Sequence, residues 1–235
     1  MTEPRGIFVT GTDTGVGKTI VSAGLVHLLV QQGQRVVGLK PVASGADSGA
    51  QGLRNQDALA LAAAGSVPLP YEMTNPLCFE PAIAPHLAAR DAGTAISVDE
   101  LEQWYACATA GAEIAIVEGA GGWRVPLHPA GFLSELPERL GLGVILVVGL
   151  RLGCLNHARL TLEAISASDR CRFIGWVGNQ IDPGFARIED NLETLEIVLG
   201  SPPLAVIPTL EAADATSAAA WLDRPLLRHA VFPPQ

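Results

Sequence analysis

A chain of 235 residues is long enough for one α/β domain and short for two. Because 49% of its residues are hydrophobic and 17% are charged, it can bury a sizeable core, which excludes general disorder. The formal net charge of −9, with only 15 Lys and Arg residues, argues against a nucleic-acid partner, since binding a phosphate backbone needs a basic face.

Features of a secreted or membrane protein are not recognisable in the sequence. The apolar run at 7–9 is too short for the core of a signal peptide, and the longest apolar stretch, 143–150, is about a third of a bilayer span. The four cysteines show neither a CxxC pair nor zinc-site spacing, which is typical of reduced thiols. We therefore expect a cytoplasmic protein without a membrane partner.

Six short apolar runs predict strands, several of them apolar on both faces like strands buried between two helical layers. They are residues 7–10, 35–40, 114–118, 144–149, 172–180 and 204–208. Segments of helical period lie between them, at about 18–32, 56–65, 97–111, 156–168 and 187–199. This alternation predicts one α/β domain over residues 1–235, with a parallel β-sheet flanked by helices on both faces.

Two stretches depart from this regular pattern. Residues 65–85 include five prolines, so we expect an ordered loop or flap over one end of the sheet. The C-terminal Phe-Pro-Pro-Gln at 232–235 is expected to be frayed.

The strongest local signal is the loop GTDTGVGKT at residues 11–19, between the first predicted strand and helix. Its backbone N–H groups would surround phosphates at a helix N-terminus, so the sheet is expected to be of the P-loop NTPase type. Lys18 would reach the β- and γ-phosphates of ATP, and the Thr19 hydroxyl would ligate Mg²⁺. The strict GxxxxGK[ST] pattern would place its first glycine at Thr12, whereas this chain has Gly11 one residue earlier.

Two carboxylates are candidates for completing a metal site beside this loop. Glu118 ends the strand predicted at 114–118, at the sheet edge where ligands bind, in the Walker-B position that more commonly holds Asp. Asp57 precedes an alanine-rich helix, so local reasoning leaves it as either a helix N-cap or a second metal ligand.

Lys40 ends the second predicted strand, where a charged side chain is costly unless it has a partner. It is either part of a structural ion pair or a second cation at the phosphates, and its expected place beside the P-loop favours the second role. Ser44 follows in the Pro-Val-Ala-Ser-Gly loop. Trp123 is either a core residue or a wall of the substrate pocket.

Taken together, eight motifs in register resemble the dethiobiotin synthetase family from the first strand to about residue 208. They are TGTDTxVGKT (10–19), KPVASG (40–45), NxDAL (55–59), APH (84–86), VEGAGGW (117–123), LGCLNHA (152–158), GWVxN (175–179) and IP (207–208). The residues beyond about 210 add nothing to the resemblance. One departure is Gly15, which stands where many members of the family carry an acidic residue.

The resemblance implies ATP- and Mg²⁺-dependent ring closure of 7,8-diaminononanoate with CO₂ or bicarbonate, through a carbamate and a carbamic-phosphoric anhydride. Lys18 and Lys40 are the implied catalytic residues. The implied ATP-binding residues are Gly15, Val16, Gly17, Lys18, Thr19, Ile20, Asp57, Glu118, Asn179, Gln180, Ile207 and Pro208. The implied Mg²⁺ ligands are Thr19, Asp57 and Glu118.

Residues for the second substrate follow from the same resemblance. Those implied to bind the carbamate or diamine are Thr14, Ser44, Glu118, Gly119, Ala120 and Gly121. A homodimer is also implied, with the substrate site at the subunit interface. In it the substrate carboxylate would be received from the neighbouring subunit by the turn of Gly153, Cys154, Leu155 and Asn156, at a helix N-terminus that suits an anion.

Three rival functions fit the phosphate loop less well. A switch ATPase acting through dimerisation and partner binding usually carries a lysine at the start of the loop, where this chain has Asp13. An amidotransferase of related fold needs a glutamine-hydrolysing domain, for which the chain has no room. A pure binding module would not need Lys18, Lys40, Asp57 and Glu118 together.

Overall fold

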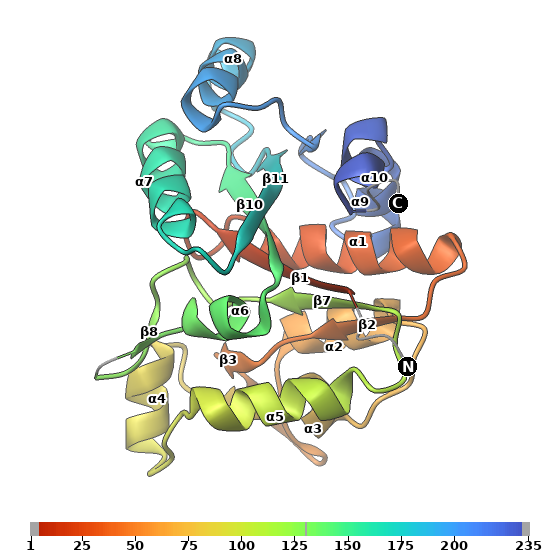
Figure 1. Ribbon diagram of the computed structural model, residues 1–235, viewed down its shortest axis with the longest axis vertical. Helices are drawn as coiled ribbons and strands as arrows, with labels where there is room; N and C mark the ends of the chain where they lie inside the picture. The colour runs from red at the N-terminus through yellow and green to blue at the C-terminus, as the bar shows by residue number, and fades with distance from the viewer. Residues whose placement is uncertain (1–4, 130, 232–235) are drawn as a thin grey trace.

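The computed structural model describes residues 5–129 and 131–231, and its centre is a six-stranded sheet in which every neighbouring pair is parallel (Figure 1). Across the sheet the strands are β12 (Ala205–Ile207), β11 (Arg172–Asn179), β10 (Gly143–Gly149), β1 (Arg5–Gly11), β7 (Ile114–Glu118) and β2 (Val36–Leu39). The carboxyl ends of β1, β2 and β7 therefore meet at one edge of the sheet, where ligands bind in open α/β folds.

Helices cover both faces of this sheet. One face carries α1 (Lys18–Gln31), α2 (Gln56–Ala64), α9 (Ala215–Leu222) and α10 (Pro225–Val231). The other carries α5 (Val98–Ala108), α6 (Glu135–Leu140), α7 (Cys154–Ser166) and α8 (Ile188–Leu199). The described residues also form α3 (Tyr71–Thr74), α4 (Pro85–Asp91) and three two-stranded sheets: β3 (Val42–Ser44) with β6 (Leu77–Phe79), β4 (Asp47–Gly49) with β5 (Gly52–Arg54), and β8 (Pro126–His128) with β9 (Gly131–Phe132).

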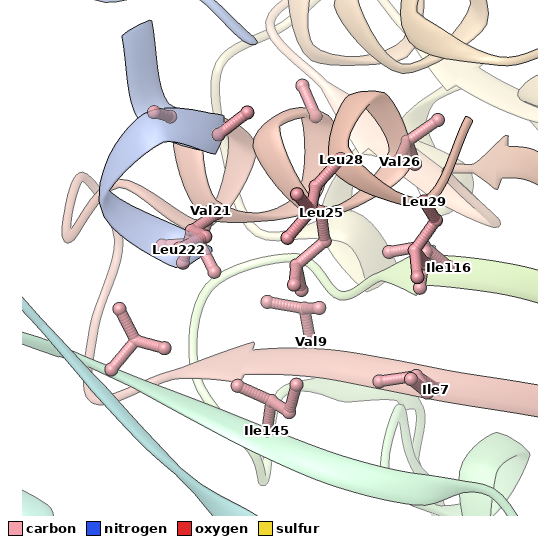
Figure 2. Close-up of a cluster of buried hydrophobic side chains, with 14 of the residues drawn as sticks. Ile7, Val9, Val21, Leu25, Val26, Leu28, Leu29, Ile116, Ile145 and Leu222 are labelled. Atoms are coloured by element: carbon pink, nitrogen blue, oxygen red, sulfur yellow. The ribbon is translucent and has the colours of Figure 1, made fainter. Parts of the chain in front are cut away.

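The central strand β1 supplies the core on both faces. Ile7 and Val9 pack under α1, whereas Phe8 points into the opposite cluster, as the period-two alternation of a strand requires (Figure 2). Helix α1 is apolar around most of its circumference because it lies between the sheet and α9. At Gly24 an added Cβ would come within 2.8 Å of Ala218 in α9, so the close contact between these helices depends on glycine.

The six predicted strands and five predicted helices are all present, with ends shifted by at most three residues. The largest shift is at the end of the helix predicted at 97–111, since α5 ends three residues earlier, at Ala108. The segment 65–85 was expected to be a loop or flap, but it contains α3 and β6. The expected fraying at 232–235 lies outside the described residues. None of the helices in the described ranges has the length and apolar character that a bilayer span requires.

Candidate active site

The phosphate loop is fixed at both of its ends by hydrogen bonds to neighbouring strands. The N–H of Thr12 donates to the carbonyl of Val147 at 3.0 Å, and Asn179 Nδ2 donates to the carbonyl of Val16 at 2.9 Å. Gly17 has φ +89°, and an added Cβ there would collide with the Asn179 amide, so this position accepts only glycine. The sequence thus builds a rigid turn whose helix, α1, begins at Lys18.

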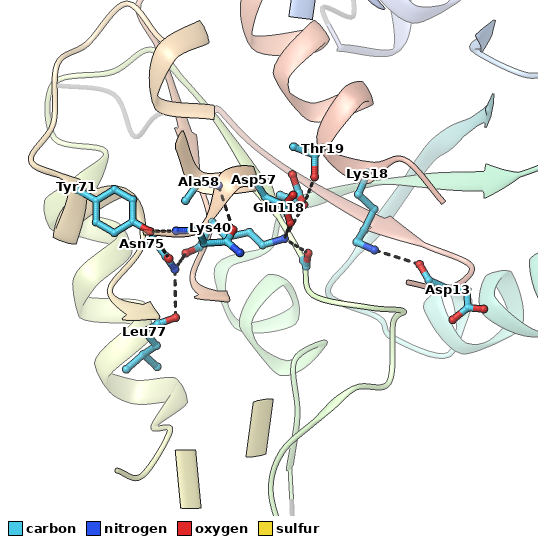
Figure 3. Close-up of polar contacts among 12 residues, drawn as sticks. Asp13, Lys18, Thr19, Lys40, Asp57, Ala58, Tyr71, Asn75, Leu77 and Glu118 are labelled. Carbon is cyan, nitrogen blue, oxygen red and sulfur yellow. Dashed lines mark hydrogen bonds and ion pairs between the residues drawn. The ribbon is translucent and has the colours of Figure 1, made fainter. Parts of the chain in front are cut away.

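Lys18 lies inside this loop with its side chain largely buried. Its Nζ donates to the carbonyl of Asp13 at 3.1 Å (Figure 3). Burial, together with the nearby charge of Lys40, lowers the pKa of Lys18 to about 8. An anion bound beside Lys18 would therefore stabilise its charged form.

The ends of β2 and β7 bring a lysine between two carboxylates (Figure 3). The Nζ of Lys40 lies 2.6 Å from Glu118 Oε1, 3.0 Å from Asp57 Oδ2 and 3.1 Å from the carbonyl of Gly119. Burial alone would lower the pKa of Lys40, but the two carboxylates outweigh it and raise this pKa. Lys40 is therefore a buried cation at the edge of the sheet where the carboxyl ends of β2 and β7 lie.

The same carboxylates face Thr19 in the first turn of α1. Thr19 Oγ1 donates to Glu118 Oε1 at 2.9 Å, so Lys40 and Thr19 share one carboxylate oxygen. The other oxygen, Glu118 Oε2, is buried and has no hydrogen-bond partner among the described residues. For Asp57, burial would raise the carboxyl pKa, but its ion pair with Lys40 lowers it. The Asp57 carboxylate is therefore available as a negatively charged oxygen ligand, and Glu118 adds the buried oxygen that has no partner among the described residues.

The helix-cap alternative for Asp57 is wrong. The N-cap of α2 is Asn55, whose side chain accepts the N–H of Ala58, while Asp57 lies in the first helical turn and turns toward Lys40. This arrangement leaves the Asp57 carboxylate free of the backbone. The alternative for Trp123 is also resolved, since it is 3% exposed and its ring packs edge-on against Phe8 in the core.

Residues that the sequence did not indicate support the end of β2. Asn75 Nδ2 donates to the carbonyl of Lys40 at 2.7 Å, and the Lys40 N–H donates to the carbonyl of Thr74. Tyr71 in turn donates to Asn75 Oδ1 and accepts the N–H of Asn55. The irregular segment 65–85 therefore holds both Lys40 and the start of α2, and only its prolines drew attention to it.

A cavity of about 780 Å³ opens between the phosphate loop and this carboxylate–lysine cluster. Its lining includes eleven of the predicted site residues: Thr14, Gly15, Gly17, Lys18, Thr19, Lys40, Ser44, Asp57, Glu118, Ala120 and Gly121. Seven other residues that line it had no predicted site role: Ala43, Ala82, Ile83, Ala84, Pro85, Val125 and Pro126. Ala84 and Pro85 belong to the Ala-Pro-His motif, which was a signal for this wall.

The remaining predicted residues lie around the cavity without lining it. Val16, Ile20 and Gly119 belong to the adjoining backbone, while Asn179, Gln180, Ile207 and Pro208 lie together at the carboxyl ends of β11 and β12. The turn of Gly153, Cys154, Leu155 and Asn156 begins α7 after β10 and does not line this cavity. A larger cavity, of about 1110 Å³, lies at the amino ends of the strands, far from the phosphate loop in the sheet.

Comparison with known proteins identifies the family. An AAA-domain family model matches residues 5–217. A protein of Pseudomonas aeruginosa (strain UCBPP-PA14), named ATP-dependent dethiobiotin synthetase BioD, is 52% identical over 221 residues, covering 93% of this chain and 96% of that protein. The chain belongs to the dethiobiotin synthetase family. A dethiobiotin synthetase of Cellvibrio japonicus is 46% identical with 95% and 98% coverage, and one of Xanthomonas oryzae pv. oryzae is 45% identical with 95% and 99% coverage.

Solved structures agree with the dethiobiotin synthetase assignment at the level of fold. A ParA family ATPase from Chlorobium tepidum has a TM-score of 0.59 at 15% identity, with 99% of each chain covered. The septum site-determining protein MinD of Pyrococcus horikoshii, in complex with Mg-ADP, has a TM-score of 0.57 at 16% identity, with 92% and 93% coverage. At such identities only the P-loop NTPase fold is shared, and the switch-ATPase function does not follow.

Proposed function

We propose that this chain acts as one P-loop domain that closes the ring of dethiobiotin from 7,8-diaminononanoate, CO₂ and ATP in biotin biosynthesis. The observation that carries this proposal is the single cavity lined by Lys18, Lys40, Thr19, Asp57 and Glu118. Phosphoryl transfer to an anion brings several negative charges close together. Two lysines, and a metal ion held by carboxylate and hydroxyl oxygens, would neutralise this charge.

ATP would bind along the phosphate loop. The backbone N–H groups from Gly15 to Ile20 would surround its phosphates at the start of α1, and Lys18 would exchange the Asp13 carbonyl for a phosphate oxygen. The adenine would lie beside the ends of β11 and β12, near Asn179, Gln180, Ile207 and Pro208. Asn179 also supports the loop, because its side-chain amide donates a hydrogen bond to the carbonyl of Val16.

The residues present fit a Mg²⁺ ion. The described residues hold no cluster of three His, Cys, Asp or Glu side chains, but a nucleotide-borne Mg²⁺ needs only one or two carboxylates besides phosphates and water. Thr19, Asp57 and Glu118 would hold it, and the partnerless Glu118 Oε2 offers a free oxygen. When bound, Mg²⁺ neutralises charge that develops on the phosphates.

The chemistry proceeds in three balanced steps. One amine of the substrate adds to CO₂ and loses a proton, giving a carbamate. A carbamate oxygen then attacks the γ-phosphorus of ATP, the bond to the β-phosphate oxygen breaks, and ADP leaves. The second amine attacks the carbonyl carbon of this carbamic-phosphoric anhydride, releases phosphate and a proton, and closes the cyclic urea.

Lys40 and the loop residues would orient these groups. The Lys40 ammonium would bridge the carbamate and the transferring phosphoryl group, while Thr14 and Ser44 would bind the carbamate end. In support, Ser44 Oγ is buried in the cavity wall and has no hydrogen-bond partner among the described residues. The diamine would lie along the backbone from Glu118 to Gly121, where Ala120 and Gly121 line the cavity.

The carboxylate of the diamine would be bound across a homodimer. We assign it to the turn of Gly153, Cys154, Leu155 and Asn156 of the neighbouring copy, because this turn begins α7 without a side-chain cap and so presents backbone N–H groups to an anion. Leu152, just before this turn, is 92% exposed, which fits a residue that a second copy covers in the dimer.

The deciding experiment measures phosphate release from Mg-ATP with and without 7,8-diaminononanoate plus bicarbonate. Release that depends on both additions, with dethiobiotin identified by mass spectrometry, is the expected result. Steady hydrolysis indifferent to the diamine would contradict the proposal and favour a switch ATPase.

A further inference from the structure

Asp13, at the tip of the phosphate loop, has all three of its acceptor oxygens engaged. Its Oδ1 accepts the N–H of Thr14 at 2.7 Å, and its carbonyl accepts Lys18 Nζ at 3.1 Å. Its Oδ2 accepts Arg151 Nη2 at 2.5 Å, although the two residues are 138 positions apart in the sequence. Asp13 thus contacts the loop tip and an arginine from another part of the fold through its carboxylate, and the loop lysine through its backbone carbonyl.

Arg151 occupies a distinctive place between two functional segments. It follows the end of β10 by two residues and precedes Gly153, the N-cap of α7, by two. The side chains of Arg151 and Asp13 are 40% and 48% exposed, so this ion pair contributes little to folding stability. Its effect is expected on the geometry of the loop.

The other anchors of the loop do not reach its tip. The bonds of Thr12 to Val147 and of Val16 to Asn179 hold the two ends of the loop. Between them, Asp13, Thr14 and Gly15 form the tip, where Thr14 and Gly15 are exposed and Gly15 has φ +74°. The Arg151 ion pair therefore fixes the part of the loop that is otherwise least constrained.

We propose that Arg151 is a positioning residue of the ATP site. It holds Asp13, and through Asp13 the loop tip, in the geometry that receives the phosphates, while Lys18 leaves the Asp13 carbonyl when a phosphate binds. Because Arg151 also begins the connection to the turn at 153–156, the same ion pair ties the nucleotide loop to the turn that receives the diamine carboxylate. This second role rests on the proposed function, whereas the first requires only that the loop binds a nucleotide.

Positioning and simple charge predict opposite results for one variant. If Arg151 acted only as a nearby positive charge, Arg151→Met would weaken nucleotide binding and Asp13→Asn would strengthen it, because the ligand is an anion. If the ion pair positions the loop, both variants weaken binding. A double variant then binds no more weakly than either single one, since each substitution breaks the same contact.

The experiment measures the Kd of Mg-ADP by calorimetry for the full chain and five variants: Arg151→Met, Asp13→Asn, the double variant, Arg151→Lys and Arg159→Met. We expect a loss of about three- to tenfold in both single variants and in the double variant, as for one shared positioning contact. Arg151→Lys should recover most of the affinity. Arg159→Met is the matched control, because it removes the same charge from an ion pair within α7 that does not contact the phosphate loop.

Several outcomes would overturn the proposal. Tighter binding by Asp13→Asn would reduce Arg151 to a charge effect, additive losses would show two independent roles, and unchanged affinity would remove Arg151 from the site. Melting temperatures of all variants, measured alongside, separate these results from misfolding. An increase in the KM of the diamine in Arg151→Met would support the link to the turn at 153–156, and an unchanged KM would contradict it. A wild-type protein without diamine turnover would contradict the proposed function, but the nucleotide-binding test would still hold.

Discussion

The ammonium of Lys40 and Oε1 of Glu118 lie 2.6 Å apart at the ends of two neighbouring parallel strands, and both side chains are buried. Glu118 Oε1 also accepts the hydroxyl of Thr19, so one oxygen joins β7, β2 and the start of α1. A lysine that is buried in this way cannot move far without leaving a carboxylate unpaired. A substitution of Lys40 should therefore change both the stability of the fold and the reaction at this site.

Replacing Lys40 tests its role in catalysis. Lys40→Gln should lower kcat by about 10²–10³, the typical effect of losing one preorganised charge contact at a transferring group. Nucleotide binding should remain, because Lys18 and the phosphate loop are untouched. Rapid-quench measurement of ADP formation, with the Kd of Mg-ADP as the control, separates the two quantities, and near-normal turnover would remove Lys40 from the mechanism.

The same cluster predicts that the stability of a Lys40 variant depends on Mg²⁺. Lys40→Met leaves Glu118 buried without its cation and should lower the free energy of unfolding by about 3 kcal/mol, near the low end of the range because Asp57 is 42% exposed. Mg²⁺ can replace the missing cation, and at ten times its Kd it would return about 1.4 kcal/mol.

Urea unfolding with and without Mg²⁺ but without nucleotide measures this effect. The wild-type protein should respond less, because Lys40 already neutralises its carboxylates. The double variant Lys40→Met/Glu118→Gln is the control that should lose the response to Mg²⁺. An equal Mg²⁺ response in wild type and Lys40→Met would argue against a metal at these carboxylates.

The sheet and the centre of the site could be predicted because their signals are local. Each of the six strands is a continuous apolar run, and Lys40 and Glu118 stand where such runs end. Parallel strands that end at one edge bring those residues together without any further information. The loop at 11–19 was equally visible, since its glycines and Lys18 carry their chemistry within a few residues.

The rest of the site depends on contacts between distant segments. Asn55 and Asp57 are both suitable helix caps, and only the position of Lys40 decides which one turns toward the backbone. The contact of Asp13 with Arg151 spans 138 positions, and neither residue belongs to a periodic pattern. Strands of two or three residues, such as β8 and β9, are too short to show periodicity at all.

The pKa of Lys18 predicts how ATP affinity depends on pH. This pKa is about 8 in the unliganded protein, so the ammonium loses its proton as the pH rises above that value. A bound triphosphate favours the charged form and raises the pKa, so binding above pH 8 takes up a proton. The Kd of Mg-ATP should therefore increase by up to about tenfold per pH unit above 8 and stay level below it.

Calorimetry in buffers of different ionisation enthalpy counts the protons taken up on binding. We expect an uptake that approaches one proton at pH 9 and is small at pH 7. The variant Lys18→Gln should show no uptake over this range. Equal uptake by the wild-type protein at both pH values would contradict the assignment to Lys18.

Gly15 and Gly17 of the phosphate loop should differ in how much a side chain destabilises them. Gly15 has φ +74° and no atom within 4 Å of an added Cβ, so Gly15→Ala introduces only backbone strain. We expect a loss of about 1 kcal/mol in unfolding free energy, less for Gly15→Asn, which tolerates this conformation better. Gly17 also has positive φ, but there a Cβ collides with the Asn179 amide that supports the loop. Gly17→Ala should therefore lose nucleotide binding as well as stability, and binding equal to that of Gly15→Ala would show that Asn179 is not needed to hold the loop.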